Sequence, residues 1–311
     1  MANAPDIPPR PILIAGPTAT GKSEFALQLA ERIGGEIISV DSMQVYRGLD
    51  IGTAKPSAAE QRRVPHHLID VAELTEGFDA ARFANLARTT VAEIVARGRR
   101  PVLCGGTGLY FKAFLEGLGN APPPDARLRA ELEAMPLPQL LDELREHDPQ
   151  TFHSIDQKNP RRIVRAVEVL RLTGKPFSAQ RAAWTAQPTT PSPCIGFGIV
   201  RPAADLHARI NARVDDMFRH GLVEETRRLL PQGLANNPTA MQAIGYRQVV
   251  EHLQGERSLE ATIELVKVRT RHFAKRQLTW FRKYAALEWM ELSVEFSIAD
   301  AVSKVQARVA D

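Results

Sequence analysis

The fold of this chain is decided by eight residues, Gly16-Pro17-Thr18-Ala19-Thr20-Gly21-Lys22-Ser23, which match G-x-x-x-x-G-K-[ST] and are called here the glycine-rich loop. An apolar run at 11–15 precedes them and is typical of a strand, and residues 24–32 have the composition of a helix. A strand, a glycine-rich turn and a helix N-terminus in this order form a cradle in which backbone N–H groups and the helix dipole face a phosphate. All eight residues are therefore predicted to bind a di- or triphosphate, with Lys22 reaching the outer phosphate and the Ser23 hydroxyl binding Mg²⁺.

The composition is that of an ordinary soluble globular protein. The chain has 311 residues, of which 44% are apolar and 24% are charged, and this length is enough for one large domain with an insertion or for two domains. No apolar run approaches the ~18 residues of a membrane-spanning helix, and the run near the N-terminus is too short for a signal peptide. Cys104 and Cys194 are far apart in the sequence and indicate neither a disulfide framework nor a zinc site. We expect a cytoplasmic monomer without a membrane segment.

Strand-like and helix-like segments alternate after the glycine-rich loop. Residues 36–40 predict a buried strand, 80–97 a helix, 101–104 a third strand, and 195–200 a further strand. This alternation is typical of a parallel, doubly wound sheet. The predicted fold class is α/β, with a parallel-sheet core like that of P-loop NTPases.

A helical insertion interrupts this core. The prolines at 122–124 are typical of a linker, short polar helices broken by prolines follow them, and residues 187–193 are again rich in Pro and Thr. The predicted domains are therefore a core formed by 1–120 and 194–311, with helices in its C-terminal part, and a small helical insertion at 121–193.

Polar residues follow two of the predicted strands at the edge where the phosphate is expected. Asp41 comes directly after the second strand, where a carboxylate can hold Mg²⁺ through water, act as a general base, or cap the next turn. The segment Gly105-Gly106-Thr107-Gly108, called here the GGTG loop, follows the third strand. Its position makes the Thr107 hydroxyl a candidate for the phosphate site.

A basic helix is predicted at 258–285, with Ser258 as its N-cap and no Gly or Pro inside. At about 100° per residue, one apolar stripe contains Val266, Phe273, Trp280 and Tyr284. Seven basic residues and no acid lie between 266 and 284: Lys267, Arg269, Arg271, Lys275, Arg276, Arg282 and Lys283. A solvated basic helix is the alternative, but the absence of a compensating acid in this segment favours contact with a phosphate backbone.

The adjacent His66 and His67 predict a structural or hydrogen-bonding role, because neighbouring residues on a strand point to opposite faces. A helix is predicted to begin with Asn159 as its cap and Pro160 at its first position. Its arginines, at 161, 162, 165 and 171, are compatible with a solvated face and with a nucleic-acid clamp alike.

These segments together resemble one family. The glycine-rich loop is followed, in this order, by DSMQVY at 41–46, GTAKP at 52–56, HHLID at 66–70, GGTGLY at 105–110, NPRRIVRA at 159–166, AIGYRQ at 243–248 and KRQLTWFRK at 275–283. The set is similar to that of bacterial tRNA dimethylallyltransferases (tRNA isopentenyltransferases), and the resemblance runs over about residues 10–292. Ser23 stands where many relatives have Thr, and both residues supply a hydroxyl.

The resemblance implies a transfer reaction that uses Mg²⁺. A dimethylallyl group would pass from dimethylallyl diphosphate to the exocyclic amine of adenosine 37, beside the anticodon of tRNAs that read codons beginning with U. Lys22, Thr107 and Arg213 would stabilise the diphosphate leaving group. Asp41 would accept the proton of the amine and, with Ser23, would be a candidate ligand of Mg²⁺.

The resemblance also implies contacts with the tRNA anticodon stem-loop. The target base would leave the stacked loop and enter the pocket, where Ser42 and Gln44 are candidates to hydrogen-bond its edge. The implied tRNA contacts are Asp41, Ser42, Met43, Gln44, Thr107, Arg127, Arg161, Arg162, Arg165, Gln242, Gly245, Tyr246, Arg247, Lys275, Arg276, Gln277, Thr279, Trp280 and Arg282.

Two other functions use the same glycine-rich loop. A small-molecule kinase would transfer the γ-phosphate of ATP and would need neither the basic helix nor the arginine-rich insertion. An RNA-binding NTPase without group transfer would keep the basic helix and have no use for Asp41 as a base. An Asp41→Ala variant would leave that function intact, whereas it would abolish a transfer reaction.

Overall fold

The computed structural model describes residues 10–181, 194–293 and 295–310. The chain divides into two compact units, one formed by the segments before 116 and after 184, the other by 116–184. The insertion predicted at 121–193 therefore begins earlier, at residue 116. Its predicted end, the Pro- and Thr-rich stretch 187–193, lies outside the described residues, as does 1–9.

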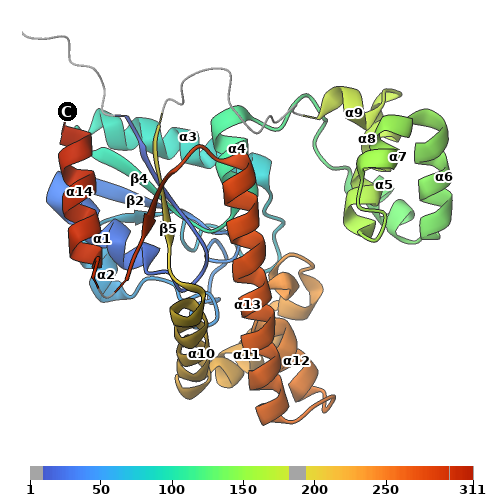
Figure 1. The fold of residues 1–311 in the computed structure, drawn as a ribbon. Helices are drawn as coiled ribbons and strands as arrows, with labels where there is room; N and C mark the ends of the chain where they lie inside the picture. Colours follow the sequence, from blue (N-terminus) through green and yellow to red (C-terminus); the bar gives the residue numbers. More distant parts are fainter. Residues whose placement is uncertain (1–9, 182–193, 294, 311) are drawn as a thin grey trace, which may run out of the picture. The chain divides into compact units, whose positions relative to one another are not determined.

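The first unit is built on a six-stranded sheet whose paired strands are all parallel, in the order β3-β2-β4-β1-β5-β6 (Figure 1). The strands are β1 (Ile12–Ala15), β2 (Gly35–Val40), β3 (His66–His67), β4 (Arg100–Gly105), β5 (Ile195–Val200) and β6 (Glu288–Glu291). The α/β class and the four predicted strands are confirmed. The sequence did not predict β3 and β6, because two residues and the stretch EWME contain no apolar run.

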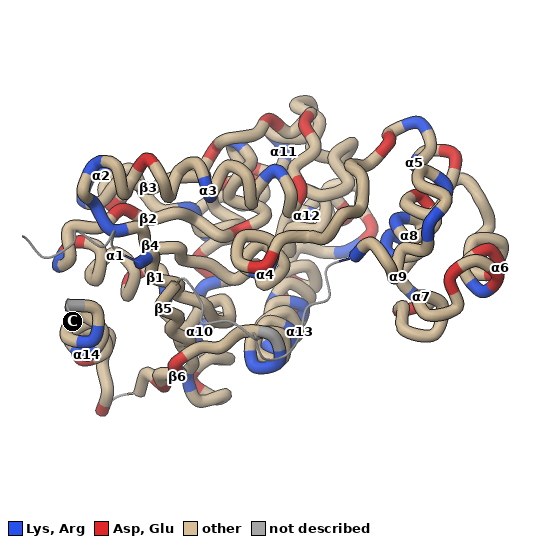
Figure 2. Tube along the Cα trace, turned by 90° about the horizontal axis from the view of Figure 1, so that it is seen from above, with Lys and Arg blue, Asp and Glu red and all other residues tan. Residues whose placement is uncertain are grey.

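Helices cover both faces of the sheet. Figure 2 shows α1 (Lys22–Ile33) and α14 (Ile298–Ala310) on one side of the row of strands, and α3 (Ala80–Ala96), α4 (Gly108–Glu116) and α13 (Leu259–Tyr284) on the other. Side chains alternate along each strand, so every second one, such as those of Ile12 and Ile14, joins the core under α1 and α14. This core fixes the positions of the strands, and so of the loops that follow them.

The remaining helices of this unit are α2 (Ala58–Arg63), α10 (Ala203–Arg219), α11 (Leu222–Leu229) and α12 (Tyr246–Leu253), with short 3₁₀ turns at Leu230–Gln232, Leu234–Asn236 and Ala240–Gln242. Both α10 and α12 pack against α13. No helix of the described residues is long and apolar enough to span a membrane.

The second unit consists of short helices with their own core. They are α5 (Ala126–Glu133), α6 (Leu137–His147), α7 (Pro149–Ser154), α8 (Pro160–Thr173) and α9 (Phe177–Gln180). Leucines at 132, 140 and 144 pack against the apolar face of α8. Asn159 caps α8 as predicted, because its side chain accepts the N–H of Arg162 at 3.3 Å.

Candidate functional site

The segments expected at the phosphate begin at one level of the sheet. Ala15 and Val40 are both register partners of Gly105, so β1, β2 and β4 end side by side. The glycine-rich loop, Asp41 and the GGTG loop therefore leave from adjacent strand ends. A Cβ on Gly105 would lie 2.0 Å from the carbonyl oxygen of Val40, so only glycine permits this close approach.

Internal hydrogen bonds shape the glycine-rich loop. Gly21 adopts φ 96° and begins α1, and Ala19 adopts φ 64°, a conformation that non-glycine residues rarely take. The carbonyl oxygen of Pro17 accepts hydrogen bonds from the Thr20 hydroxyl at 3.0 Å and from the Lys22 Nζ at 2.9 Å. The loop is thus curved around the Lys22 amino group, as a phosphate cradle requires.

Three arginines hold this loop from outside. Arg201 Nε donates to the carbonyl oxygen of Thr20 at 2.8 Å, and Arg209 Nε donates to that of Ala19 at 3.0 Å. Arg213 Nη1 lies 3.5 Å from the Thr18 hydroxyl oxygen. Sequence reasoning identified the third arginine and missed the first two. The available signal was the position of Arg201 directly after β5 and the spacing of four between the others, which places both on one face of α10.

Two partly buried cations, Lys22 and Arg213, lie at the loop. Burial lowers the pKa of Lys22 to about 8, with a further lowering by Arg213 that is opposed by the charges of Cys104 and Asp41. Burial likewise lowers the pKa of Arg213, and Asp41 opposes that shift. The Asp41 carboxylate is therefore within electrostatic reach of both cations. Desolvated cations of this kind bind an anion more strongly than exposed ones do.

Asp41 caps the turn that follows β2. Its Oδ1 accepts the backbone N–H groups of Met43 at 2.8 Å and Gln44 at 3.2 Å, so the capping interpretation is confirmed. Among the described residues no hydrogen bond to Oδ2 is found, which leaves that oxygen able to accept a proton or bind a cation. The Thr107 hydroxyl oxygen accepts the N–H of Ser42 at 3.1 Å and joins the GGTG loop to this turn.

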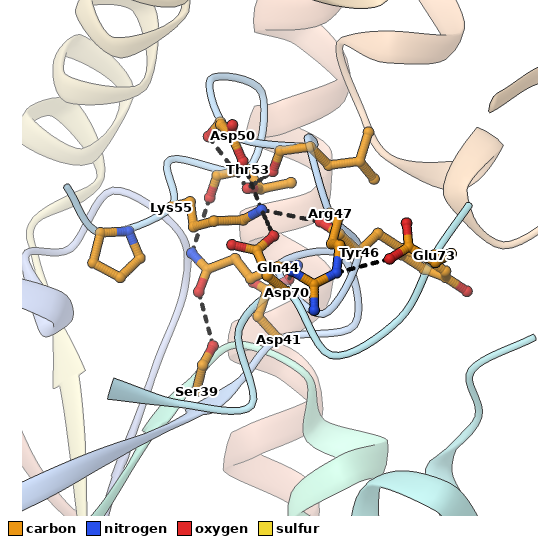
Figure 3. Close-up of polar contacts among 12 residues, drawn as sticks. Ser39, Asp41, Gln44, Tyr46, Arg47, Asp50, Thr53, Lys55, Asp70 and Glu73 are labelled. Carbon is orange, nitrogen blue, oxygen red and sulfur yellow. Dashed lines mark hydrogen bonds and ion pairs between the residues drawn. The ribbon is translucent and has the colours of Figure 1, made fainter. Parts of the chain in front are cut away.

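The side-chain amide of Gln44 forms hydrogen bonds within the chain on both sides of it. In Figure 3 its Oε1 accepts the Ser39 hydroxyl at 2.8 Å, and its Nε2 donates to the carbonyl oxygens of Thr53 and Ala54, both at 3.2 Å. Gln44 thus makes internal hydrogen bonds in this structure, and its contact with a base stays a prediction. Gln44 joins the start of residues 41–55, called here the Asp41 loop, to their end.

Lys55 forms the second closure of the Asp41 loop. Its side chain is 5% exposed, and its Nζ donates to Asp50 Oδ1 at 2.6 Å and to Asp70 Oδ1 at 2.5 Å. A third bond runs to the carbonyl oxygen of Tyr46 at 3.0 Å (Figure 3). One buried ammonium group thus organises three turns of the chain, a role that the sequence did not predict.

Tyr246 packs against the Asp41 loop, and its side chain is not exposed to solvent in this structure. It is fully buried. Its hydroxyl donates to Glu225 Oε1 at 2.5 Å and accepts the N–H of Gly52 at 3.1 Å. The implied RNA contact of Tyr246 is therefore replaced by a structural role. Of its neighbours, Gly245 is buried as well, whereas Gln242 and Arg247 are exposed.

The helix α13 begins after Ser258 as predicted, but it buries a different face. The buried side chains include Val266, Ala274, Gln277 and Phe281, while Phe273 is 37% exposed and Trp280 is partly buried. The predicted stripe was therefore rotated; the side chain of its last member, Tyr284, lies outside the described residues. The exposed face carries Lys275, Arg276, Thr279 and Arg282 among the candidate RNA contacts.

Part of the positive charge on α13 is neutralised by α10. Lys267 Nζ lies 2.8 Å from Asp215 of α10 and 2.9 Å from Glu264 of α13 itself. Arg271 donates to Asn211 at 2.5 Å, an uncharged amide that holds the guanidinium without neutralising it. The prediction considered only acids within 266–284, so it overestimated the free charge. In Figure 2, where α13 is seen nearly end-on, several segments of this helix are coloured as Lys or Arg.

Within the second unit, Arg165 is held internally. Its guanidinium donates to the fully buried Glu168 at 2.6 Å and to the carbonyl oxygen of Pro122 at 2.5 Å. These contacts give Arg165 a structural role, and its assignment as an RNA contact stays a prediction. Arg161, Arg162 and Arg127 are exposed, and Arg127 pairs with Glu131 at 3.1 Å.

The two histidines of β3 form hydrogen bonds, as predicted. His66 Nδ1 lies 2.8 Å from the carbonyl oxygen of Val64, and His67 Nε2 lies 2.7 Å from Glu36 Oε2. Both hydrogen bonds hold side chains of β3, which is the edge strand of the sheet.

The parallel sheet and its covering helices define an α/β protein with a doubly wound core. Comparison with known proteins identifies the family. The model of the IPP transferase family matches residues 44–284, and this chain belongs to that family. It is similar to tRNA dimethylallyltransferase 1 of Trichlorobacter lovleyi, with 48% identity over 91% of this chain and 93% of the relative. The tRNA dimethylallyltransferase of a Nocardioides species is 45% identical over 99% of both chains.

Solved structures agree with this assignment. The full-length tRNA isopentenylpyrophosphate transferase of Bacillus halodurans has a TM-score of 0.69 and 38% identity, covering 97% of each chain. A eukaryotic dimethylallyltransferase described as acting on tRNA has a TM-score of 0.77 and 26% identity, covering 96% of this chain and 77% of its own.

Proposed function

We propose that this protein transfers the dimethylallyl group of dimethylallyl diphosphate to the exocyclic amine of an adenosine in tRNA, releasing diphosphate. Its membership of a family of tRNA prenyltransferases supports this activity and sets aside a small-molecule kinase. This chemistry is supported by one observation: Asp41 and the glycine-rich loop leave from adjacent strand ends, and Asp41 interacts electrostatically with the partly buried cations Lys22 and Arg213.

The site residues divide between the two halves of the reaction. As the bond between the dimethylallyl carbon and the diphosphate oxygen breaks, Lys22, Arg213 and the loop N–H groups stabilise the negative charge of the leaving diphosphate. As the new carbon–nitrogen bond forms, the amine must lose a proton, because its lone pair is shared with the adenine ring. Asp41 Oδ2 accepts that proton, while Oδ1 stays bonded to the turn.

Mg²⁺ is the proposed cofactor; the Ser23 hydroxyl would hold it directly, and Asp41 would hold it through water. Both are hard oxygen donors of the kind that Mg²⁺ prefers. No cluster of three or more His, Cys, Asp or Glu residues in the described chain is arranged to hold a metal. Bound by these residues, Mg²⁺ would supply positive charge that neutralises the leaving diphosphate.

The finer proposal concerns the acceptor. The anticodon stem-loop of tRNAs that read codons beginning with U is the proposed partner, and adenosine 37 the target. The exposed Lys275, Arg276 and Arg282 of α13 supply charge for its phosphates. The proposed location of the protein is the cytoplasm, and its proposed oligomeric state is a monomer.

Transfer of label tests this function. Purified protein is incubated with Mg²⁺, labelled dimethylallyl diphosphate and an unmodified anticodon stem-loop. We expect label in the RNA, and none when the target adenosine is replaced by guanosine. Label that enters the guanosine variant equally would contradict the proposed acceptor.

A further inference from the structure

Gln277 is buried on a helix whose neighbouring polar residues face solvent. Its side chain is 7% exposed, whereas Lys275 and Arg276 just before it are exposed. A polar side chain buried at this depth requires hydrogen-bonding partners. Those partners, and not RNA, determine what Gln277 does.

The amide of Gln277 connects two loops of the site. Its Oε1 accepts the backbone N–H of Thr18 in the glycine-rich loop at 2.9 Å. Its Nε2 donates to the carbonyl oxygen of Gly106 in the GGTG loop, also at 2.9 Å. A primary amide is suited to this place because it accepts at one atom and donates at the other.

The GGTG loop has glycines where α13 approaches most closely. A Cβ on Gly106 would lie 2.3 Å from Gln277 Nε2, and a Cβ on Gly108 would lie 2.2 Å from the Trp280 ring. One residue further along the helix, Phe281 packs edge to face on Phe111, with ring centroids 5.9 Å apart. The turn of α13 that contains Gln277 is therefore docked on the loop at several points.

We propose that Gln277 is a positioning residue that sets the spacing between the glycine-rich loop and the GGTG loop, and so the shape of the diphosphate site. One face of α13 then organises the diphosphate site, while the exposed face beside it contacts RNA. This inference rests on the proposed function and adds to it a division of labour between adjacent residues, Gln277 and Arg276.

Matched variants on one helical turn test this division. We expect Gln277→Met to raise KM for dimethylallyl diphosphate and to lower kcat, each by about tenfold, because misplaced loops no longer fit the leaving group. Its Kd for the stem-loop stays within about twofold of the wild-type value, since phosphate contacts set that affinity. Arg276→Met is the matched control and shows the reverse, with weaker stem-loop binding and an unchanged KM for dimethylallyl diphosphate.

A second variant keeps the test decisive if Gln277→Met fails to fold. Gln277→Glu has the same shape and still accepts from Thr18, but it cannot donate to Gly106, and we expect it to shift KM and kcat in the same direction. A Gln277 variant with weakened stem-loop binding and a normal KM for dimethylallyl diphosphate would overturn the proposal, as would one with neither constant changed.

Calorimetry with pyrophosphate separates this inference from the proposed function. If wild-type protein transferred no label, the proposed function would fail. Weaker pyrophosphate binding by Gln277→Met would still support the positioning role, and unchanged binding would refute it.

Discussion

At the scale of single residues, Asp41 performs two tasks with its two oxygens. Oδ1 accepts two backbone N–H groups, and Oδ2 is left for chemistry. The sequence predicted Asp41, Thr107 and the glycine-rich loop because motifs and strand ends identify them. It did not predict Arg201 and Arg209, whose partners are carbonyl oxygens 181 and 190 residues away. Hydrogen bonds of that kind depend on tertiary structure, so the positions of the arginines in the sequence do not identify their partners.

Replacing Asp41 by Asn separates these tasks, because the Asn side-chain oxygen still accepts the two N–H groups. We expect kcat for transfer to fall by roughly 10²–10⁴-fold, the usual contribution of a general base. Stem-loop affinity and the unfolding temperature remain close to wild type. Single-turnover transfer assays and RNA titrations measure these quantities, and an Asn variant with near-normal kcat would contradict the role of Asp41 as base.

The pKa of Lys22, lowered to about 8 by burial, predicts how diphosphate binding depends on pH. An anion favours the protonated amine, so the bound state has the higher pKa. Affinity for pyrophosphate is therefore full below about pH 8 and falls as the pH rises above it. Calorimetric titrations across this range measure the fall. Lys22→Met should bind weakly at every pH and lose this step; a step that persists in the variant would assign it to another group.

At the scale of elements, sequence patterns predicted the position of the Asp41 loop and of α13 but not the contacts that each makes. The bounds of α13 were predicted closely because Ser258 and the absence of Gly and Pro mark them. The buried face was not, because the partners that α10 supplies to Lys267 and Arg271 cannot be recognised from the sequence of α13. The Asp41 loop was recognised as a motif, but its closure by Lys55 requires Asp50 and Asp70 to meet in space.

Lys55→Met should loosen the Asp41 loop. The buried ammonium forms three hydrogen bonds, and its removal leaves one carbonyl oxygen and two carboxylates without this donor. The free energy of unfolding should therefore fall by about 1–3 kcal/mol. Arg47→Met is the control in the same loop, because the Arg47–Glu73 pair is 60% and 57% exposed. That pair should contribute ~0.5 kcal/mol or less. Urea unfolding compares the two, and equal decreases would refute the central role of Lys55.

At the scale of the whole molecule, the parallel core was predictable because buried strands alternate with amphipathic helices. The sheet edge with β6 and the covering helix α14 were not, since neither carries a motif. The net charge of +4 is modest, so RNA affinity depends on which cations are exposed. Ion pairs within each unit, such as Lys267–Asp215 and Arg165–Glu168, reduce the number available.

The salt dependence of stem-loop binding measures that available charge. Removing Arg276 and Arg282 together should weaken binding and reduce the slope of log K against log salt by about 0.7 for each RNA phosphate that is no longer neutralised. Lys267→Met is the control, because its charge already faces Asp215 and Glu264. A slope that changes for Lys267→Met and not for the arginine pair would show that RNA binds elsewhere.

The stoichiometry of the reaction tests the central proposal most directly. With dimethylallyl diphosphate, Mg²⁺ and the stem-loop, diphosphate release and modified adenosine are counted in one time course. The proposed transfer predicts one diphosphate for each adenosine that gains a dimethylallyl group, with no requirement for ATP. Consumption of ATP with phosphate passed to a small molecule, and RNA left unmodified, would contradict it.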